Sequence, residues 1–328
     1  MTRIIIPKPY LHLNVGVTVG MKGFLRLQCI NKFSGKVTQD TGWFPNTILN
    51  AGRNIMADRS DWIDCCQVGT NGTFPAALID KQAETSLGNY YAGTSNVTTT
   101  TNGQAASAPY YGWKRRTYRF ASGTVAANLQ EAGIGWSTAG GSTLICRAPI
   151  LDPILGTPTT ITPLADELLD VTYELRYYPP LVDVTSPQVT LDGVAYDTIT
   201  RAASVTGDRW SASIGTAMGV YNSLVSDWRA FDGVLGAITS TPSGTSANWV
   251  AGSIYNSAYS NNSYQVVLNC IVASTGWNLV SGIRSLRIRT TAGDYQTQFD
   301  AAAGGATVPK TSAYTMTMAW TLAWAEYV

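Results

Sequence analysis

The sequence has little charge and a single histidine among its 328 residues. Charged residues make up 13% of the chain, whereas about 25% is usual for a globular domain. The 22 Lys and Arg residues nearly balance the 21 Asp and Glu residues, so no overall field attracts a phosphate backbone, an anionic membrane or an acidic substrate. We therefore expect neither nucleic acid nor a membrane among the partners. A weakly charged surface also favours association into an assembly.

Long apolar runs are missing as well. The amino terminus carries three consecutive isoleucines before Pro7, far fewer than the core of a signal peptide needs. No window approaches the roughly 18 apolar residues of a membrane helix, so we expect a soluble protein made in a reducing cytoplasm. The five cysteines lack the spacing of a disulfide framework or a zinc site and are expected to be mostly buried thiols: Cys29, Cys65, Cys66, Cys146 and Cys270.

Catalytic and cofactor motifs are also missing. A Ser-His-Asp or Cys-His mechanism would have to use His12, which lies in an alternating segment typical of a surface strand. The sequence has no GxSxG, HExxH, phosphate-loop or calcium-loop motif. The carboxylates that a glycosidase would need form no obvious pair: Asp58, Asp61, Asp64, Glu131, Asp166 and Glu167. We therefore predict a non-enzymatic protein with no catalytic residues, no cofactor and no metal site, although isolated carboxylates in turns could still hold an ion.

Short apolar runs separated by turn clusters are abundant and predict an all-β fold. Apolar and polar residues alternate clearly at 169–177, so one face of that strand is expected to be buried and the other wet. A second alternating strand, at 314–325, closes the chain with aromatic residues on one face. Residues 264–272 are mostly apolar and are expected to be covered on both faces, whereas residues 285–289 alternate and are expected to be half-exposed.

Other segments predict little regular structure. One short helix is predicted at 50–63, where Asn50 can act as the N-cap and apolar residues recur at three- and four-residue spacing. Residues 85–107 are polar, rich in Thr, Asn and Gly and without periodicity, so we expect an exposed loop or an extended arm.

Prolines within residues 179–187 indicate a linker. The sequence therefore predicts two β-sandwich or jelly-roll-like domains, residues 1–180 and 187–328, with the helix and the arm in the first. Whether the two domains are duplicates stays open.

Five aromatic residues are the candidate contact sites: Tyr90, Tyr91, Tyr110, Tyr111 and Trp113. Such rings can stack on sugars, which would make the protein a reader of host surface glycans. They can also pack against a sheet or a neighbouring subunit, where aromatic rings supply large contact areas at low entropic cost. We favour the packing role.

An ordered set of short motifs occupies the first half of the chain. Residues 46–72 begin with Asn-x-Ile-x-Asn-x-Gly, continue through the predicted helix and end in a Val-Gly-Thr turn, where Asn71 displaces a final glycine. Three motifs follow in order: Glu131-Ala132-Gly133, Arg147-Ala148 and a Val-Thr-Tyr strand at 170–175. This succession, over roughly residues 40–180, resembles virion structural proteins of tailed bacteriophages. The Val308-Pro309-Lys310-Thr311 turn before the last strand resembles them too.

The resemblance implies a structural subunit of the virion, made in the host cytoplasm and assembled as a homo-oligomer at the tail, neck or collar, or baseplate. Its partners would be copies of itself and other virion structural proteins. Three alternatives stay open: a receptor- or glycan-binding fibre, a capsid decoration protein, and a depolymerase that acts on host polysaccharide.

Overall fold

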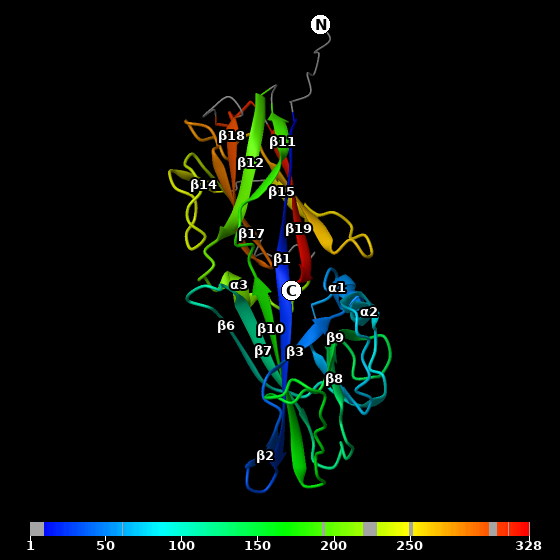
Figure 1. The fold of residues 1–328 in the computed structure, drawn as a ribbon. Coiled ribbons are helices and arrows are strands. Elements are labelled where there is room, and N and C mark those ends of the chain that lie inside the picture. Colours follow the sequence, from blue (N-terminus) through cyan, green and yellow to red (C-terminus); the bar gives the residue numbers. More distant parts are fainter. Residues whose placement is uncertain are drawn as a thin grey trace.

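The computed structural model describes residues 10–60, 62–191, 194–218, 228–248, 252–301, 307–313 and 315–327. The chain is 48% strand and 6% helix, which confirms the predicted all-β fold. The strands form one sheet of 13 strands and one of six. Figure 1 shows an elongated molecule in which the long strand β1 (Tyr10–Asn31) follows the long axis.

β1 contributes to both ends of the molecule. Its first half pairs in parallel with β19 (Thr315–Glu326). Its second half pairs antiparallel with β10 (Glu167–Tyr178) along one edge. Along the other edge it pairs with β3 (Phe44–Ile48) and β2 (Val37–Asp40). A single strand of 22 residues thus ties the first and last parts of the chain together.

The other elements fall into three groups. The large sheet also contains β4 (Cys65–Gly69), β5 (Tyr90–Thr94), β6 (Val97–Gln104), β7 (Gly112–Phe120), β8 (Glu131–Gly135), β9 (Leu144–Pro149), β15 (Gly252–Asn256) and β16 (Gln265–Val272). The small sheet contains, in spatial order, β11 (Val184–Leu191), β12 (Val194–Ala203), β18 (Gly293–Ala301), β17 (Ser285–Thr290), β13 (Arg229–Phe231) and β14 (Ser246–Asn248). The helices are α1 (Asn50–Ile55), α2 (Leu78–Ala83) and α3 (Arg209–Ala212).

Several strands lie where alternation predicts them, but their burial differs. β10 and β19 are strands as predicted. The polar face of β10 is not wet, because Asp170 and Glu174 on it are buried. In β16 buried residues alternate with more exposed ones, although both of its faces were predicted to be covered. β17 is buried at almost every position, although it was predicted to be half-exposed. The loop after β13 covers β17, and the Ser285 hydroxyl donates to the Gly233 carbonyl of this loop at 2.7 Å.

Three short helices replace the single predicted one. α1 starts at Asn50 as predicted, but its N-cap is Leu49. Asn50 does not cap the helix; its side chain accepts a hydrogen bond from the guanidinium of Arg53. α2 and α3 have six and four residues, which is too short for a helical period to be visible in the sequence.

α1 ends at Ile55 rather than at residue 63 because tertiary donors occupy its last carbonyl groups. The indole N–H of Trp324 donates to the Arg53 carbonyl at 2.9 Å, and the Met218 N–H donates to the Met56 carbonyl at 2.7 Å. A longer helix would need those carbonyls for its own hydrogen bonds.

Residues 85–107 are not the predicted loop. They contain β5 and β6, and β6 forms backbone hydrogen bonds with β7. Residues 98–102 are exposed, as expected. The low hydrophobicity of this segment reflects exposure rather than a lack of strand structure.

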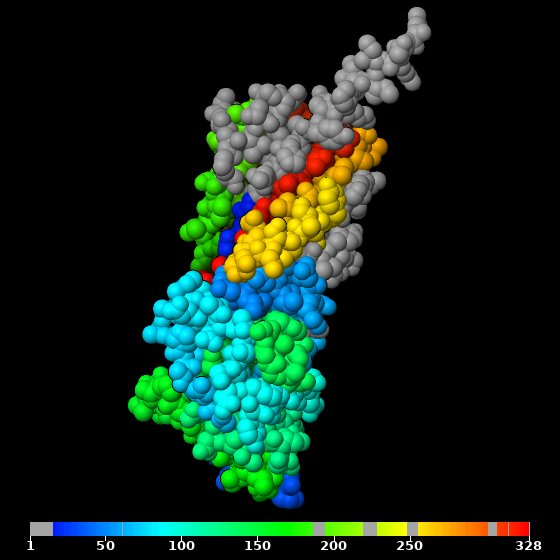
Figure 2. Space-filling view, turned by 90° about the vertical axis from the view of Figure 1, so that its right-hand side faces the viewer, coloured from blue at the N-terminus to red at the C-terminus, as the bar shows by residue number. Residues whose placement is uncertain are grey.

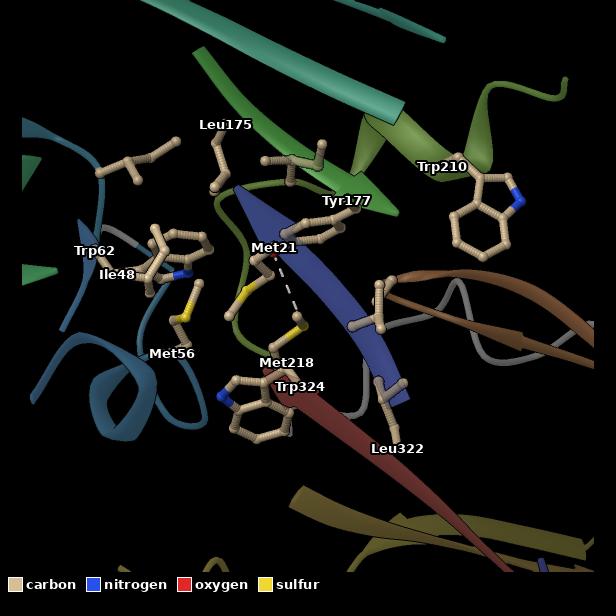
Figure 3. Close-up of a cluster of buried hydrophobic side chains, with 14 of the residues drawn as sticks. Met21, Ile48, Met56, Trp62, Leu175, Tyr177, Trp210, Met218, Leu322 and Trp324 are labelled. Carbon is tan, nitrogen blue, oxygen red and sulfur yellow. Dashed lines mark hydrogen bonds between the residues drawn. The ribbon is translucent and has the colours of Figure 1, made fainter. Parts of the chain in front are cut away.

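One hydrophobic cluster continues through both ends of the molecule. In its middle, Met21 of β1, Tyr177 of β10 and Trp324 of β19 converge on Met218 (Figure 3). The division into two domains stays a prediction; in the structure, residues from both sides of it share this cluster. The linker predicted at 179–187 ends early, because β11 begins within it.

A loop near the C-terminal end of the sequence rests on α1. The Tyr259 hydroxyl and the Asn262 N–H donate to Asn54 Oδ1 at 2.8 and 2.7 Å. In Figure 2 this yellow-orange segment lies directly above the blue helix. The contact adds to β1 in holding the two ends of the molecule together.

Candidate interaction surface

β7, β10 and β1 present one polar face to the outside, opposite the hydrophobic core. Their register aligns side chains across the three strands: Trp113, Arg176 and Lys22; Arg115, Glu174 and Phe24; Thr117, Thr172 and Arg26; Arg119, Asp170 and Gln28. Successive residues of a strand point to opposite faces, so the intervening residues, such as Tyr118, Tyr173 and Leu25, lie in the core. We call this aligned set the outer face.

Arginines cover the carboxylates of the outer face. Glu174 and Asp170 are only 3% and 7% exposed. Arg119 donates through Nε and Nη2 to both oxygens of Asp170, at 2.7 Å each. Arg176 and Arg115 donate through Nε to the two oxygens of Glu174, at 2.6 and 3.0 Å. Charge-assisted hydrogen bonds of this kind fix the orientation of the guanidinium groups.

Aromatic rings flank two of these arginines. Each guanidinium lies over two rings, 4.3–5.1 Å from the ring centroids: Trp43 and Trp113 for Arg115, and Phe24 and Tyr111 for Arg176. A cation over an aromatic face is held by the ring quadrupole. The outer face is therefore a rigid layer of alternating rings and guanidinium groups.

Two more aromatic rings, Tyr178 and Tyr327, extend this set of rings beyond Tyr111. The Tyr327 ring stacks on Tyr178 at 4.0 Å, and Tyr111 lies on Tyr178 at 5.4 Å. The Tyr327 ring lies over Gly20, where a Cβ atom would come within 2.7 Å of it. The absence of a side chain at this position of β1 makes the stacking possible.

The outer face has unused hydrogen-bond donors. Arg26, Arg115 and Arg119 each turn Nε and Nη2 toward a carboxylate. Nη1 of these arginines has no partner within the described part of the chain. Five cationic side chains stand against three carboxylates on this face: Lys22, Arg26, Arg115, Arg119 and Arg176 against Asp40, Asp170 and Glu174. Its chemistry suits a partner that presents acceptor oxygens.

A groove of about 470 Å³ adjoins the outer face. It lies among β3, β9, α2 and the end of β19, of which Figure 1 shows α2, β3 and β9 close together. Its lining is largely apolar: Pro45, Phe74, Pro75, Leu78, Pro149 and Leu151. Lys22 and Lys81 also line it, and neither makes an ion pair within the described residues.

A buried ion-pair network holds one wall of the groove. Arg147 donates to Glu131 through Nε at 2.8 Å and to Glu84 through Nη1 at 2.8 Å. Its Nη2 donates to the Thr73 carbonyl at 3.1 Å, and its guanidinium lies 4.7 Å from the Phe74 ring centroid. The segment that contains Phe74 and α2 is therefore fastened to β8 and β9.

The structure separates the predicted contact residues into two sets. Tyr111 and Trp113 flank arginines on the outer face, and Tyr110 is half-buried against the core. Sequence reasoning missed Trp43 and the arginines of β7. The spacing of the charged residues could have indicated the arginines. Asp170 and Glu174 are four residues apart, and so are Arg115 and Arg119, so two antiparallel strands can pair both charges at once.

Tyr90 and Tyr91 lie apart from that set, on β5. Both rings are exposed. The Tyr90 hydroxyl donates to the Thr138 carbonyl at 2.8 Å, and the Tyr91 hydroxyl accepts the Ala126 N–H at 3.4 Å. Their hydroxyl groups are thus engaged within the chain, and the Tyr90 ring packs against Gly140, while about 40% of each residue remains exposed.

Four of the six carboxylates considered for catalysis make structural contacts: Glu131 with Arg147, Asp64 with Arg116, Asp166 with Asn31, and Glu167 with Thr38. Asp58 is exposed. Asp61 and the side chain of His12 lie outside the described residues. Among the residues that are described, no three His, Cys, Asp or Glu side chains are grouped so that they could hold a metal ion. The described helices include none with the length and apolar character needed to cross a membrane.

All five cysteines are buried, as expected. Burial raises the pKa of the Cys29 and Cys146 thiols to about 12. It also raises the pKa of the Cys66 thiol. Thiols held in this way stay protonated and poorly nucleophilic at neutral pH.

Comparison with known proteins gives no relative: no protein-family model, no curated protein and no solved structure matches this chain.

Proposed function

We propose that this chain is a non-enzymatic structural subunit of a tailed-bacteriophage virion. In this proposal it assembles as a homo-oligomer at the tail, neck or collar, or baseplate, and contacts copies of itself and other virion structural proteins. It is made in the host cytoplasm and carried in the particle. The resemblance over roughly residues 40–180 supplies the virion context, and the outer face supplies the means of assembly.

The outer face is the observation that carries the proposal. Protein interfaces concentrate their binding energy in Trp, Tyr and Arg side chains that are held in place before the partner arrives. Arg115 and Arg176 are held by buried Glu174 and by aromatic rings. A partner therefore meets an ordered surface and loses little side-chain entropy on binding.

The motifs that carry the resemblance also build the groove beside this surface. Glu131 and Arg147 fasten the groove wall. Gly52 of α1 lies against the backbone of β9, where a Cβ atom would come within 2.6 Å of the Ile145 carbonyl oxygen. The shared motifs are thus residue types that this packing requires, which supports a common scaffold for a contact surface.

A second candidate is a receptor- or glycan-binding role, favoured by the exposed adjacent rings of Tyr90 and Tyr91. Aromatic faces can stack on sugar rings while their hydroxyl groups are occupied elsewhere. Replacing both residues by alanine and measuring adsorption of the particle to host cells tests this role. Unchanged adsorption would count against it.

The leading proposal is tested in the particles themselves. Cells that produce the chain are lysed, and the released particles are purified through a density gradient and washed in high salt. The chain is expected in the particle fraction at a fixed stoichiometry, measured by mass spectrometry. Recovery only as free protein, with none in the particles, contradicts the proposal.

A further inference from the structure

We propose that the groove binds the turn at residues 152–156 of a second copy of this chain. This contact rests on the proposed self-assembly and specifies its geometry. The turn is an exposed acidic and aliphatic segment, and the groove is an apolar surface with two lysines.

The turn holds two aliphatic side chains in solvent. Ile154 is 90% exposed and Leu155 is 73% exposed. Oδ1 of Asp152 accepts the N–H groups of both residues at 2.8 Å. The Gly156 N–H donates to the Asp152 carbonyl at 2.9 Å, which closes the turn. A closed turn that keeps apolar side chains in water is a preformed contact element.

The groove matches the turn in both polarity and charge. Its apolar lining, which includes Phe74 and Leu78, can cover the two aliphatic side chains. Lys22 and Lys81 stand at the same groove without ion pairs in the described part of the chain and can face the Asp152 carboxylate. Electrostatic complementarity of this kind fixes the register of an interface.

The groove also carries an arginine that is already paired and a carboxylate that, among the described residues, accepts only neutral hydrogen bonds. Arg147 is paired with Glu131 and Glu84. The Glu326 carboxylate accepts hydrogen bonds from the Gln82 side chain at 2.7 Å and from the Ile48 N–H at 3.3 Å. Lys22 and Lys81 are therefore the groove cations without an ion pair in the described part of the chain, and they stand against the single carboxylate of Glu326; Lys81 Nζ also lies 5.8 Å from the Phe74 ring centroid.

The turn does not fill the groove of its own chain. Leu151 lines the groove, but Ile154 and Leu155 project into solvent. The contact must then join two molecules. Because the turn directly follows Leu151 of the groove, two copies can exchange their turns about a two-fold axis, or the contact can pass from copy to copy and close into a ring.

Mixed cross-linking tests the contact directly. Leu78→Cys places a thiol in the groove, and Ile154→Cys places one on the turn. The five native cysteines are buried, so the new thiols are the reactive ones. The two variants are purified separately, mixed, oxidised gently and analysed on a non-reducing gel.

The mixture is expected to give on the order of tenfold more covalent dimer than either variant alone, because bound partners hold the thiols at a high effective concentration. Mixing Leu78→Cys with Val280→Cys is the control, since Val280 is fully exposed and belongs to neither surface. Dimer no higher than in this control, in a wild-type chain that still self-associates, overturns the contact and leaves the proposed function standing. A chain that is monomeric at every concentration contradicts both.

A second pair of variants removes the contact without touching the core. Ile154→Asp with Leu155→Asp changes only exposed side chains, so the melting temperature should stay within a few degrees of wild type. Self-association is expected to weaken on the order of tenfold or more, because two aliphatic groups that the contact would bury become charged. Unchanged association would overturn the contact.

Discussion

Glu131 and Arg147 are the two residues whose buried ion pair holds the wall of the groove. Their side chains are 1% and 2% exposed. Breaking a buried pair from one side leaves an uncompensated charge, which costs about 3–5 kcal/mol. Arg147→Met should therefore lower the free energy of unfolding in urea by about that amount.

Arg26→Met is the matched control for this prediction. Its partner Asp40 is 31% exposed and Arg26 itself is 36% exposed. An exposed pair contributes about 0–1 kcal/mol, so the loss should be small. Equal effects of the two variants would contradict the assignment of Arg147 as the fastening of the groove wall.

The buried thiols give a prediction about pH. In the unfolded chain Cys29 and Cys146 ionise near their ordinary pKa of 9.0, whereas in the folded chain they stay protonated up to about 12. The unfolded state therefore binds fewer protons across this window, and stability falls as the pH rises from about 9 toward 12. Cys29→Ala should make this fall less steep in urea unfolding series at pH 8 and 10.

A thiol reagent gives an independent readout. At pH 8 the native protein should react far more slowly than the urea-unfolded protein, in which all five cysteines become accessible. Rapid labelling of all five thiols in the native state would contradict their burial.

At the scale of the strand, β1 depends on glycines where side chains of its neighbouring strands converge. At Gly23 a Cβ atom would come within 2.7 Å of the Tyr173 hydroxyl and would also meet the Asn46 side chain. Overpacking of this kind costs about 1–3 kcal/mol, so Gly23→Ala should lower the free energy of unfolding by that amount. Gly16→Ala, in the same strand with its nearest neighbour at 3.3 Å, should cost less.

Alternation of apolar and polar residues predicts that a segment is a strand, but it predicts poorly which of its side chains are buried. β10 and β19 follow from their own residues, because a period of two is local. The burial of Asp170 and Glu174 does not, because it depends on arginines that β7 brings across from another part of the chain. α1 begins as predicted but ends early, since Trp324 and Met218 take its carbonyls.

The candidate site was predicted only in part for the same reason. Tyr111 and Trp113 were identified as aromatic contact residues, and the structure places them beside Arg176 and Arg115. Trp43 carries no periodic signal of its own. Its position over the guanidinium of Arg115 depends on three strand pairings: β3 with β1, β1 with β10, and β10 with β7.

At the scale of the whole molecule, β1 runs along the length of the 13-stranded sheet. The strand pairs with β19 in one half and with β10 in the other, and the hydrophobic cluster in Figure 3 fills the junction. The elongated shape in Figure 1 suits a subunit of a repeated assembly, as we propose.

The mass of the purified chain in solution tests the central claim of self-assembly through the outer face. Sedimentation velocity over a wide concentration range should show an oligomer for wild type and for Lys36→Glu, a charge reversal at an exposed site in the loop between β1 and β2. Lys22→Glu combined with Trp43→Ser should give a folded monomer with a modestly lower melting temperature, because the Trp43 ring no longer packs on Arg115 but neither replaced side chain is fully buried. A wild-type chain that stays monomeric throughout, or a double variant that assembles as wild type does, contradicts the account.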